Sequence, residues 1–76
     1  LEYGTNSLSI QKESIKDYST FVIIDDLLAT GGTAKAISNL LTSQHKKITG
    51  LSTVIELKDL AGRKQFNFPV SSQIIF

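Results

Sequence analysis

The middle of the chain joins a short apolar run to a helical repeat. Residues 21–24 (Phe-Val-Ile-Ile) are apolar without alternation, which predicts a central parallel strand buried on both faces. Ala34, Ile37 and Leu41 recur at helical spacing and predict a helix over about 33–44. A strand followed by a helix is the first half of a parallel α/β unit.

A second β-rich run follows at residues 48–57 and completes the pattern. Strand, helix and strand form one βαβ crossover over residues 21–57, whose two strands lie parallel. The predicted fold class is therefore α/β with a mainly parallel sheet.

The two ends of the chain carry shorter patterns. Residues 7–11 alternate polar and apolar, and Gly4-Thr5-Asn6 is good turn chemistry, so residues 1–12 are predicted to form a hairpin with its tip at 4–6. Polar residues 14–19 predict a turn. Residues 58–76 predict a polar loop around Gly62 and then a last strand at about 72–76.

Composition limits the class of protein. A chain of 76 residues is one small domain or part of one, and it has no cysteine to form disulfides. A net charge of +1 gives no attraction to nucleic acid, and the longest apolar run is too short to span a membrane. No signal peptide is visible and no Met begins the chain, so we expect a cytoplasmic protein with residues missing upstream.

The candidate chemistry lies between the first strand and the helix. Asp25 and Asp26 are expected at the carboxyl end of a parallel strand, where open α/β sheets bind ligands. The small residues that follow allow close approach of the backbone to a ligand, and Gly31 and Gly32 can adopt positive φ. Several amides and the helix N-terminus then favour an anion such as a phosphate.

The carboxylate pair and the loop have other interpretations. One Asp can accept hydrogen bonds from sugar hydroxyls while the other orients a loop, a water or a magnesium ion. The loop contains no lysine, which excludes the P-loop of nucleotide-binding proteins. A Gly-Gly pair alone is more often a simple chain reversal, and Asp-Asp a solvated strand exit. The complete block over residues 22–33 favours a binding site.

This block resembles the phosphoribosyl pyrophosphate (PRPP) motif of type I phosphoribosyltransferases. Its Asp-Asp-Leu-Leu-Ala-Thr-Gly-Gly-Thr form is most similar to the adenine-specific members of the family. Residues 1–4 (Leu-Glu-Tyr-Gly), with Leu-Ser-Ile at 8–10, resemble their catalytic hairpin. Residues 56–60 (Glu-Leu-Lys-Asp-Leu), with Gly62 and Arg63, resemble the strand and loop beside the purine.

The resemblance implies a fold and an activity. Residues 1–76 would be the C-terminal part of a Rossmann-like phosphoribosyltransferase domain, with the catalytic hairpin at 1–12, the PRPP-binding βαβ unit at 21–57 and a closing loop and strand at 58–76. The reaction implied is adenine plus PRPP to AMP plus pyrophosphate, a step of purine salvage that requires Mg²⁺. The family also implies a homodimer.

The resemblance also implies roles for single residues. Glu2 would accept the adenine proton, and Asp25 and Asp26 would lie at the ribose hydroxyls, within reach of a metal through water. The ribose 5-phosphate would be held by Ala29, Thr30, Gly31, Gly32 and Thr33. Tyr3 would belong to the mobile hairpin and Leu57 would pack against the purine.

Without the resemblance, Glu2 is a surface carboxylate, Tyr3 ordinary strand packing and Leu57 ordinary core. Lys58, Arg63 and Lys64 suggest a solvated loop more than a phosphate patch. His45 is interpreted as a cation at the helix end, and Phe66 and Phe68 as core or dimer packing.

Because the N-terminal part of such enzymes is absent, the 76 residues alone are expected to fold poorly and to be inactive. Two alternatives stay open: a non-catalytic PRPP-binding purine regulator, and a phosphoribosyltransferase for another purine.

Overall fold

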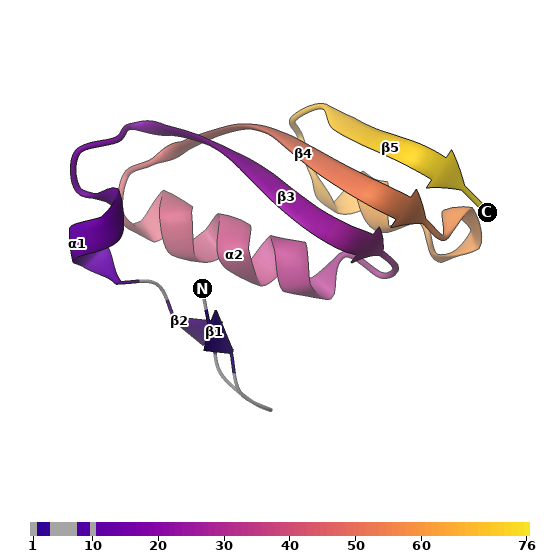
Figure 1. Cartoon of the computed structure of the whole chain (residues 1–76), viewed down its shortest axis with the longest axis horizontal. Coiled ribbons are helices and arrows are strands. Elements are labelled where there is room, and N and C mark those ends of the chain that lie inside the picture. Colours follow the sequence, from indigo (N-terminus) through magenta and orange to yellow (C-terminus); the bar gives the residue numbers. More distant parts are fainter. Residues whose placement is uncertain (1, 4–7, 10) are drawn as a thin grey trace.

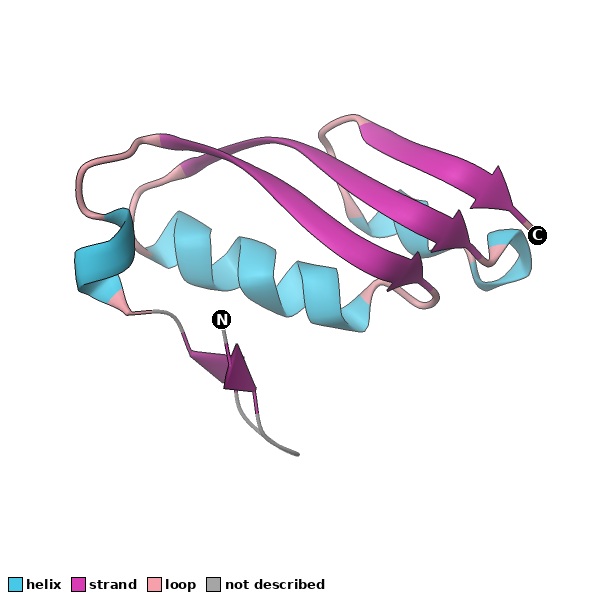
Figure 2. Cartoon of the chain, in the orientation of Figure 1, coloured by secondary structure: helices cyan, strands magenta, loops and turns pink. Residues whose placement is uncertain are grey.

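A parallel sheet forms the body of the molecule in the computed structural model, which describes residues 2–3, 8–9 and 11–76. Its strands lie in the order β3–β4–β5, and both neighbouring pairs are parallel. The strands are β3 (Thr20–Leu28), β4 (Lys47–Glu56) and β5 (Val70–Ile75). The predicted α/β fold with a mainly parallel sheet is confirmed (Figures 1 and 2).

The predicted βαβ unit is also confirmed. Helix α2 (Gly32–Ser43) connects β3 to β4 and runs along one face of the sheet (Figure 1). Its bounds differ from the expected 33–44 by one residue at each end, which is the usual uncertainty of helix termini.

Two short strands precede this unit. Strand β1 (Glu2–Tyr3) pairs antiparallel with β2 (Leu8–Ser9). The two strands of the predicted hairpin are therefore confirmed, and its expected tip at residues 4–6 lies outside the described residues.

The predicted polar turn at residues 14–19 was wrong in its first part. One helical turn, α1 (Lys12–Ile15), occupies this position, and the side chain of Ile15 is buried. The N–H of Tyr18 then donates to the Ile15 carbonyl at 3.1 Å. A single apolar residue in a polar stretch gives no periodicity, so the sequence pattern concealed this helical turn.

The two faces of β3 differ in exposure. Ile23 is 5% exposed on the face that packs against α2, whereas Val22 is 57% and Ile24 80% exposed. The prediction of a strand buried on both faces was therefore wrong for the described part of the chain. Strand β3 lies at the edge of the described sheet, and α2 covers only one side. A continuous apolar run cannot distinguish an edge strand from a central one.

The core lies between the sheet and α2. Four buried residues form its centre: Ile23, Leu28, Ala34 and Leu51. Phe66 and Phe68 pack against this cluster, with their ring centroids 5.2 Å apart. Of the two interpretations of these rings, core packing is the one that the structure supports. The segment between β4 and β5 thus lies on the same face of the sheet as α2.

Helix α2 ends in a left-handed residue. His45 has φ 62°, its N–H donates to the Thr42 carbonyl at 2.9 Å, and the N–H of Lys46 donates to the Leu41 carbonyl at 3.0 Å. This is the Schellman arrangement, in which the left-handed position usually holds glycine. His45 therefore forms the helix C-terminal cap through its backbone, a role that its interpretation as a helix-end cation did not include.

The connection from β4 to β5 is folded into two short 3₁₀ turns. These are η1 (Lys58–Leu60) and η2 (Gly62–Gln65), where the sequence predicted a polar loop. Strand β5 begins at Val70, two residues before its predicted start, opposite Leu51 of β4. Within the described residues, no helix has the length and apolar character needed to cross a membrane.

Candidate functional site

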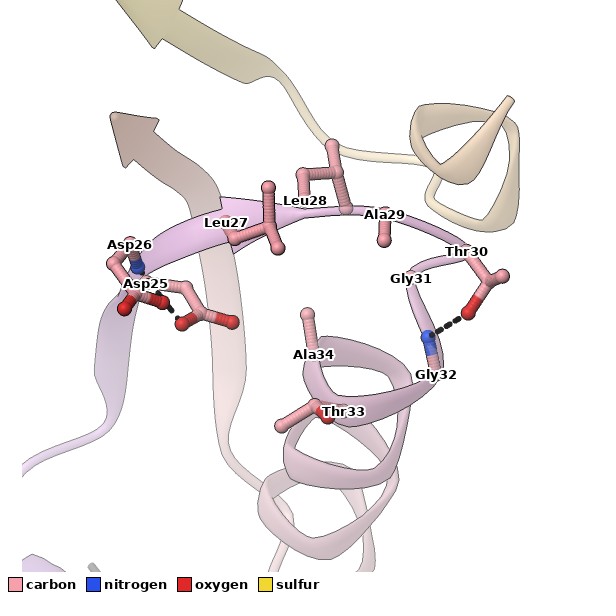
Figure 3. Close-up of a pocket in the computed structure, with 10 residues that line it drawn as sticks. All are labelled: Asp25, Asp26, Leu27, Leu28, Ala29, Thr30, Gly31, Gly32, Thr33 and Ala34. Atoms are coloured by element: carbon pink, nitrogen blue, oxygen red, sulfur yellow. Dashed lines mark hydrogen bonds between the residues drawn. The ribbon is translucent and has the colours of Figure 1, made fainter. Parts of the chain in front are cut away.

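A hollow of about 250 Å³ lies where β3 gives way to α2. Ten consecutive residues line it, and Figure 3 draws all of them: Asp25, Asp26, Leu27, Leu28, Ala29, Thr30, Gly31, Gly32, Thr33 and Ala34. The structure therefore brings both predicted carboxylates and the whole predicted phosphate loop to one hollow. None of the ten is a lysine.

Backbone amides are the main groups of this hollow that are able to donate hydrogen bonds to an anion. Gly31 is left-handed, with φ 89°, and its carbonyl accepts the first helical hydrogen bond from the N–H of Lys35 at 2.8 Å. The N-cap residue is Gly31 itself, which has no side chain to cap this helix start. The amides of the first turn have no intrahelical partner, so they can donate to a phosphate with help from the helix dipole.

Thr30 adds a hydroxyl to the same loop. The N–H of Gly32 donates to Thr30 Oγ1 over 3.4 Å, a long and weak hydrogen bond (Figure 3). A Cβ at Gly32 would meet only Thr30 Oγ1, at 3.6 Å, whereas a Cβ at Gly31 would lie 2.9 Å from the Gly62 carbonyl oxygen. Gly31 is thus required by the fold itself, and Gly32 leaves open space for a ligand.

The two carboxylates differ in position. Strand β3 continues to Leu28, so the prediction that Asp25 and Asp26 end the strand was wrong. Asp25 is half-buried and points toward the first turn of α2, whereas Asp26 is exposed (Figure 3). The N–H of Asp26 donates to Asp25 Oδ1 at 2.8 Å. Burial, with an added contribution from the neighbouring Asp26, raises the pKa of Asp25 above its ordinary value.

A glycine from the β4–β5 connection packs closely against the backbone of residues 29–31. Gly62 is buried, and a Cβ on it would overlap the carbonyl oxygen of Ala29 and lie 3.1 Å from the Gly31 nitrogen. Gln65 Nε2 also donates to the Thr30 carbonyl at 3.1 Å. Sequence reasoning did not find this contact, because a glycine in a polar loop carries no signal of what it packs against.

An ion pair between the buried Glu56 and the exposed Arg63 holds that connection in place. Arg63 donates from Nε to Glu56 Oε2 at 2.9 Å and from Nη2 to Oε1 at 2.6 Å, and Ser72 Oγ donates to the same Oε1 at 2.6 Å. These hydrogen bonds, above all that of Arg63, lower the pKa of Glu56 to about 2. The interpretation of Arg63 as part of a solvated loop agrees with its side chain, which is 45% exposed, but it did not include the hydrogen bonds of the guanidinium to a buried carboxylate.

Of the remaining predicted site residues, Leu57 is not among the described residues that line this hollow. Leu57 is half-buried just after β4, and its N–H donates to the Leu28 carbonyl at 2.9 Å. Glu2 and Tyr3 lie in β1, and their side chains are outside the described part of the structure. Their predicted roles at the purine stay predictions.

The carboxylates of Asp25 and Asp26 fit the way in which Mg²⁺ is usually bound in proteins. Among the described residues, no three His, Asp or Glu side chains gather into a metal cage. Mg²⁺ usually keeps several waters and is bound by one or two carboxylates together with substrate phosphates. Asp25 and Asp26 beside a phosphate loop fit that arrangement.

Comparison with known proteins agrees with the resemblance of the sequence. The chain is 58% identical over 76 residues to the adenine phosphoribosyltransferase of Prochlorococcus marinus strain MIT 9312, and it covers 45% of that protein. It therefore spans less than half the length of the curated relatives that it matches. No protein-family model matches the chain.

Solved structures share the fold. The adenine phosphoribosyltransferase of Thermoanaerobacter pseudethanolicus has a TM-score of 0.72 and 40% identity, over 75% of this chain and 34% of that one. The enzyme of Saccharomyces cerevisiae, solved with an imino-altritol bisphosphate and adenine, has a TM-score of 0.66 and 38% identity, over 68% and 31%. The α/β fold described above is thus part of the fold of these enzymes.

Proposed function

We infer that this chain is the phosphate- and ribose-binding part of an adenine phosphoribosyltransferase. The enzyme would transfer the phosphoribosyl group of PRPP to adenine, giving AMP and pyrophosphate. The observation that carries the proposal is the hollow, which combines first-turn amides that have no intrahelical partner with the half-buried Asp25 in a chain 58% identical to such an enzyme.

The phosphate end of the substrate belongs in the loop. The 5-phosphate would accept hydrogen bonds from the amides of residues 29–33 and from the hydroxyls of Thr30 and Thr33. Asp25, directed toward the helix start, would accept hydrogen bonds from the ribose hydroxyls, and Asp26 would orient water at the mouth of the hollow. These contacts hold the ribose while its C1 carbon is displaced.

The purine end would depend on the proposed hairpin and on the residue that follows β4. Glu2, in the proposed catalytic hairpin at residues 1–12, would accept the proton that adenine loses as its nitrogen bonds to C1. A well-placed general base contributes roughly 10²–10⁴-fold to the rate. Tyr3 would help the hairpin to exclude water, and Leu57 would pack against the purine ring.

Mg²⁺ is the cofactor that this chemistry calls for, because it stabilises the negative charge of a pyrophosphate leaving group as a Lewis acid. Asp25 and Asp26 would hold it through water, together with the phosphates of PRPP. A homodimer and a cytoplasmic location complete the proposal, as the family implies.

The chain supplies only part of such a site. Because it spans less than half of its curated relatives, the 76 residues alone are expected to be inactive. A PRPP-binding regulator and an enzyme for another purine are not favoured, since the relatives and structural neighbours described above are adenine phosphoribosyltransferases.

The direct test is an assay of the full-length protein with PRPP, Mg²⁺ and labelled adenine. We expect AMP and pyrophosphate, with hypoxanthine and xanthine as poor substrates. A protein that binds PRPP but forms no AMP would support the regulator. A protein that is active only with another purine would show that adenine is not the substrate.

The role of Glu2 needs its own variant. Glu2→Ala should lower turnover roughly 10²-fold or more and change PRPP binding little. Glu13→Ala, which changes an exposed carboxylate on α1, is the matched control. If PRPP binding fell and turnover did not, Glu2 would be a substrate contact and not the base.

A further inference from the structure

We propose that the turn at residues 61–65, clamped to the end of β4 by the two hydrogen bonds of Arg63 to the buried Glu56 carboxylate, is a positioning element that holds residues 29–31 in their phosphate-binding conformation. This inference rests on the proposed function, because it assigns a role to residues that do not line the hollow.

The clamp joins three elements of the fold. The Glu56 side chain, at the end of β4, is 4% exposed, and it accepts both hydrogen bonds of the Arg63 fork from η2. Ser72 of β5 donates a third. A bidentate guanidinium–carboxylate pair fixes direction as well as distance, so the position of η2 is set relative to the sheet.

Gly62, next to Arg63, connects η2 to the loop at residues 29–31 by direct backbone contact. It packs so closely against the backbone of Ala29 and Thr30 that no Cβ fits between them. The contact is mutual, since a Cβ on Gly31 would lie 2.9 Å from the Gly62 carbonyl oxygen. Two glycine backbones in direct contact leave the loop no room to shift toward η2.

Gln65 fixes one peptide plane of the loop. The Nε2 of its side chain donates to the Thr30 carbonyl at 3.1 Å, and its main-chain carbonyl accepts from Lys35 Nζ at 3.2 Å. In a trans peptide the carbonyl and the following N–H point in opposite directions. Holding the Thr30 carbonyl toward Gln65 therefore directs the N–H of Gly31 away from η2.

The structure thus separates binding from positioning. Residues 29–33 would touch the phosphate, whereas Gly62 and Gln65 act on the loop from behind, and Glu56 and Arg63 act through them. None of these four residues lines the hollow. Loss of the positioning should weaken phosphate binding selectively and leave the adenine side unchanged.

Gln65→Met tests the hydrogen bond without adding charge near the phosphate. In the full-length protein, we expect the dissociation constant for ribose 5-phosphate, measured by calorimetry, to rise roughly three- to tenfold, the equivalent of one lost hydrogen bond. KM for PRPP should rise similarly, while KM for adenine and the thermal midpoint change little. Gln73→Met, at an exposed position of β5, is the matched control and should behave like wild type.

Arg63→Lys tests the clamp, because it keeps the charge and removes the fork. It should weaken ribose 5-phosphate binding at least as much as Gln65→Met. Equal affinity in folded Gln65→Met, folded Arg63→Lys and wild type would overturn the inference, as would a wild-type protein that binds no ribose 5-phosphate. Wild type that binds ribose 5-phosphate but forms no AMP would overturn the proposed function alone, while the variants still test the positioning.

Discussion

Arg63 holds the buried carboxylate of Glu56 with two hydrogen bonds, 2.9 Å from Nε to Oε2 and 2.6 Å from Nη2 to Oε1. The pair joins the end of β4 to the turn behind the candidate phosphate loop. Removing Arg63 would leave the buried Glu56 carboxylate without its counter-charge, which is destabilising.

The stabilisation from Glu56 should depend on pH. Its pKa is lowered from 4.5 to about 2 in the folded protein, so folding favours the ionised carboxylate. The contribution is complete above the unfolded pKa of 4.5 and is lost as the pH falls toward 2. At about 1.4 kcal/mol per pKa unit, its upper limit is about 3.5 kcal/mol.

Urea unfolding of wild type and Glu56→Gln at pH 7, 4.5 and 3 measures this contribution. The difference in free energy of unfolding should be largest at pH 7 and should shrink below pH 4.5. Glu13→Gln, which removes an exposed pair with Lys16, should change little at any pH. A difference for Glu56→Gln that is the same at all three pH values would contradict the assignment.

The two glycines of the loop should respond differently to substitution. Gly31→Ala places a Cβ in a left-handed residue 2.9 Å from the Gly62 carbonyl oxygen, and should cost about 1–3 kcal/mol of stability as well as phosphate affinity. In Gly32→Ala the added Cβ would contact only Thr30 Oγ1, at 3.6 Å. It should keep the stability of the fold and raise KM for PRPP.

Thermal unfolding and KM for PRPP, measured on both variants, distinguish the two effects. The larger Gly32→Val should block approach of the ligand more strongly still. Unchanged KM for PRPP in Gly32→Val would remove residues 29–33 from the phosphate site.

The ionised Asp25 should lower the stability of the fold while it contributes to PRPP binding. Its raised pKa means that folding disfavours the ionised form, so the charge lowers stability as the pH rises through the folded pKa. Asp25→Asn should therefore raise the free energy of unfolding at pH 7, with a smaller gain at acid pH where Asp25 is protonated. KM for PRPP should rise roughly 10–100-fold, the equivalent of a lost charged hydrogen bond.

Asp26→Asn is the matched comparison, because Asp26 is exposed and its change should affect stability less. The assignment of Asp25 fails if Asp25→Asn binds PRPP as wild type does.

His45 offers a test away from the site. Its φ of 62° is unfavourable for a residue with a Cβ, so His45→Gly should raise the free energy of unfolding by about 0.5–1 kcal/mol. Gln44→Gly, at a φ of −96°, should lower it instead. Equal effects of the two changes in urea unfolding would contradict the Schellman cap.

Local patterns in the sequence predicted the β3–α2–β4 unit and the small-residue loop at residues 29–33 that lines the hollow. Residues 20–56 follow the order of strand, helix and strand that the apolar run and the helical spacing indicated. Of the Gly-Gly pair, Gly31 lies where left-handed backbone and close approach are needed, whereas Gly32 is the first residue of α2 and does not have a positive φ. These features depend on neighbours along the chain, which a sequence displays directly.

The tertiary structure alone decided what lies behind that loop. Gly62 packs against Ala29, Gln65 donates to Thr30, and Ser72 and Arg63 share Glu56. Most of these partners are 16 to 35 positions apart in the chain, and each pairing arises only when the β4–β5 connection folds onto the face of the sheet that α2 also covers. Which face of β3 is covered was decided in the same way, because burial depends on what packs against a strand and not on the strand's own residues.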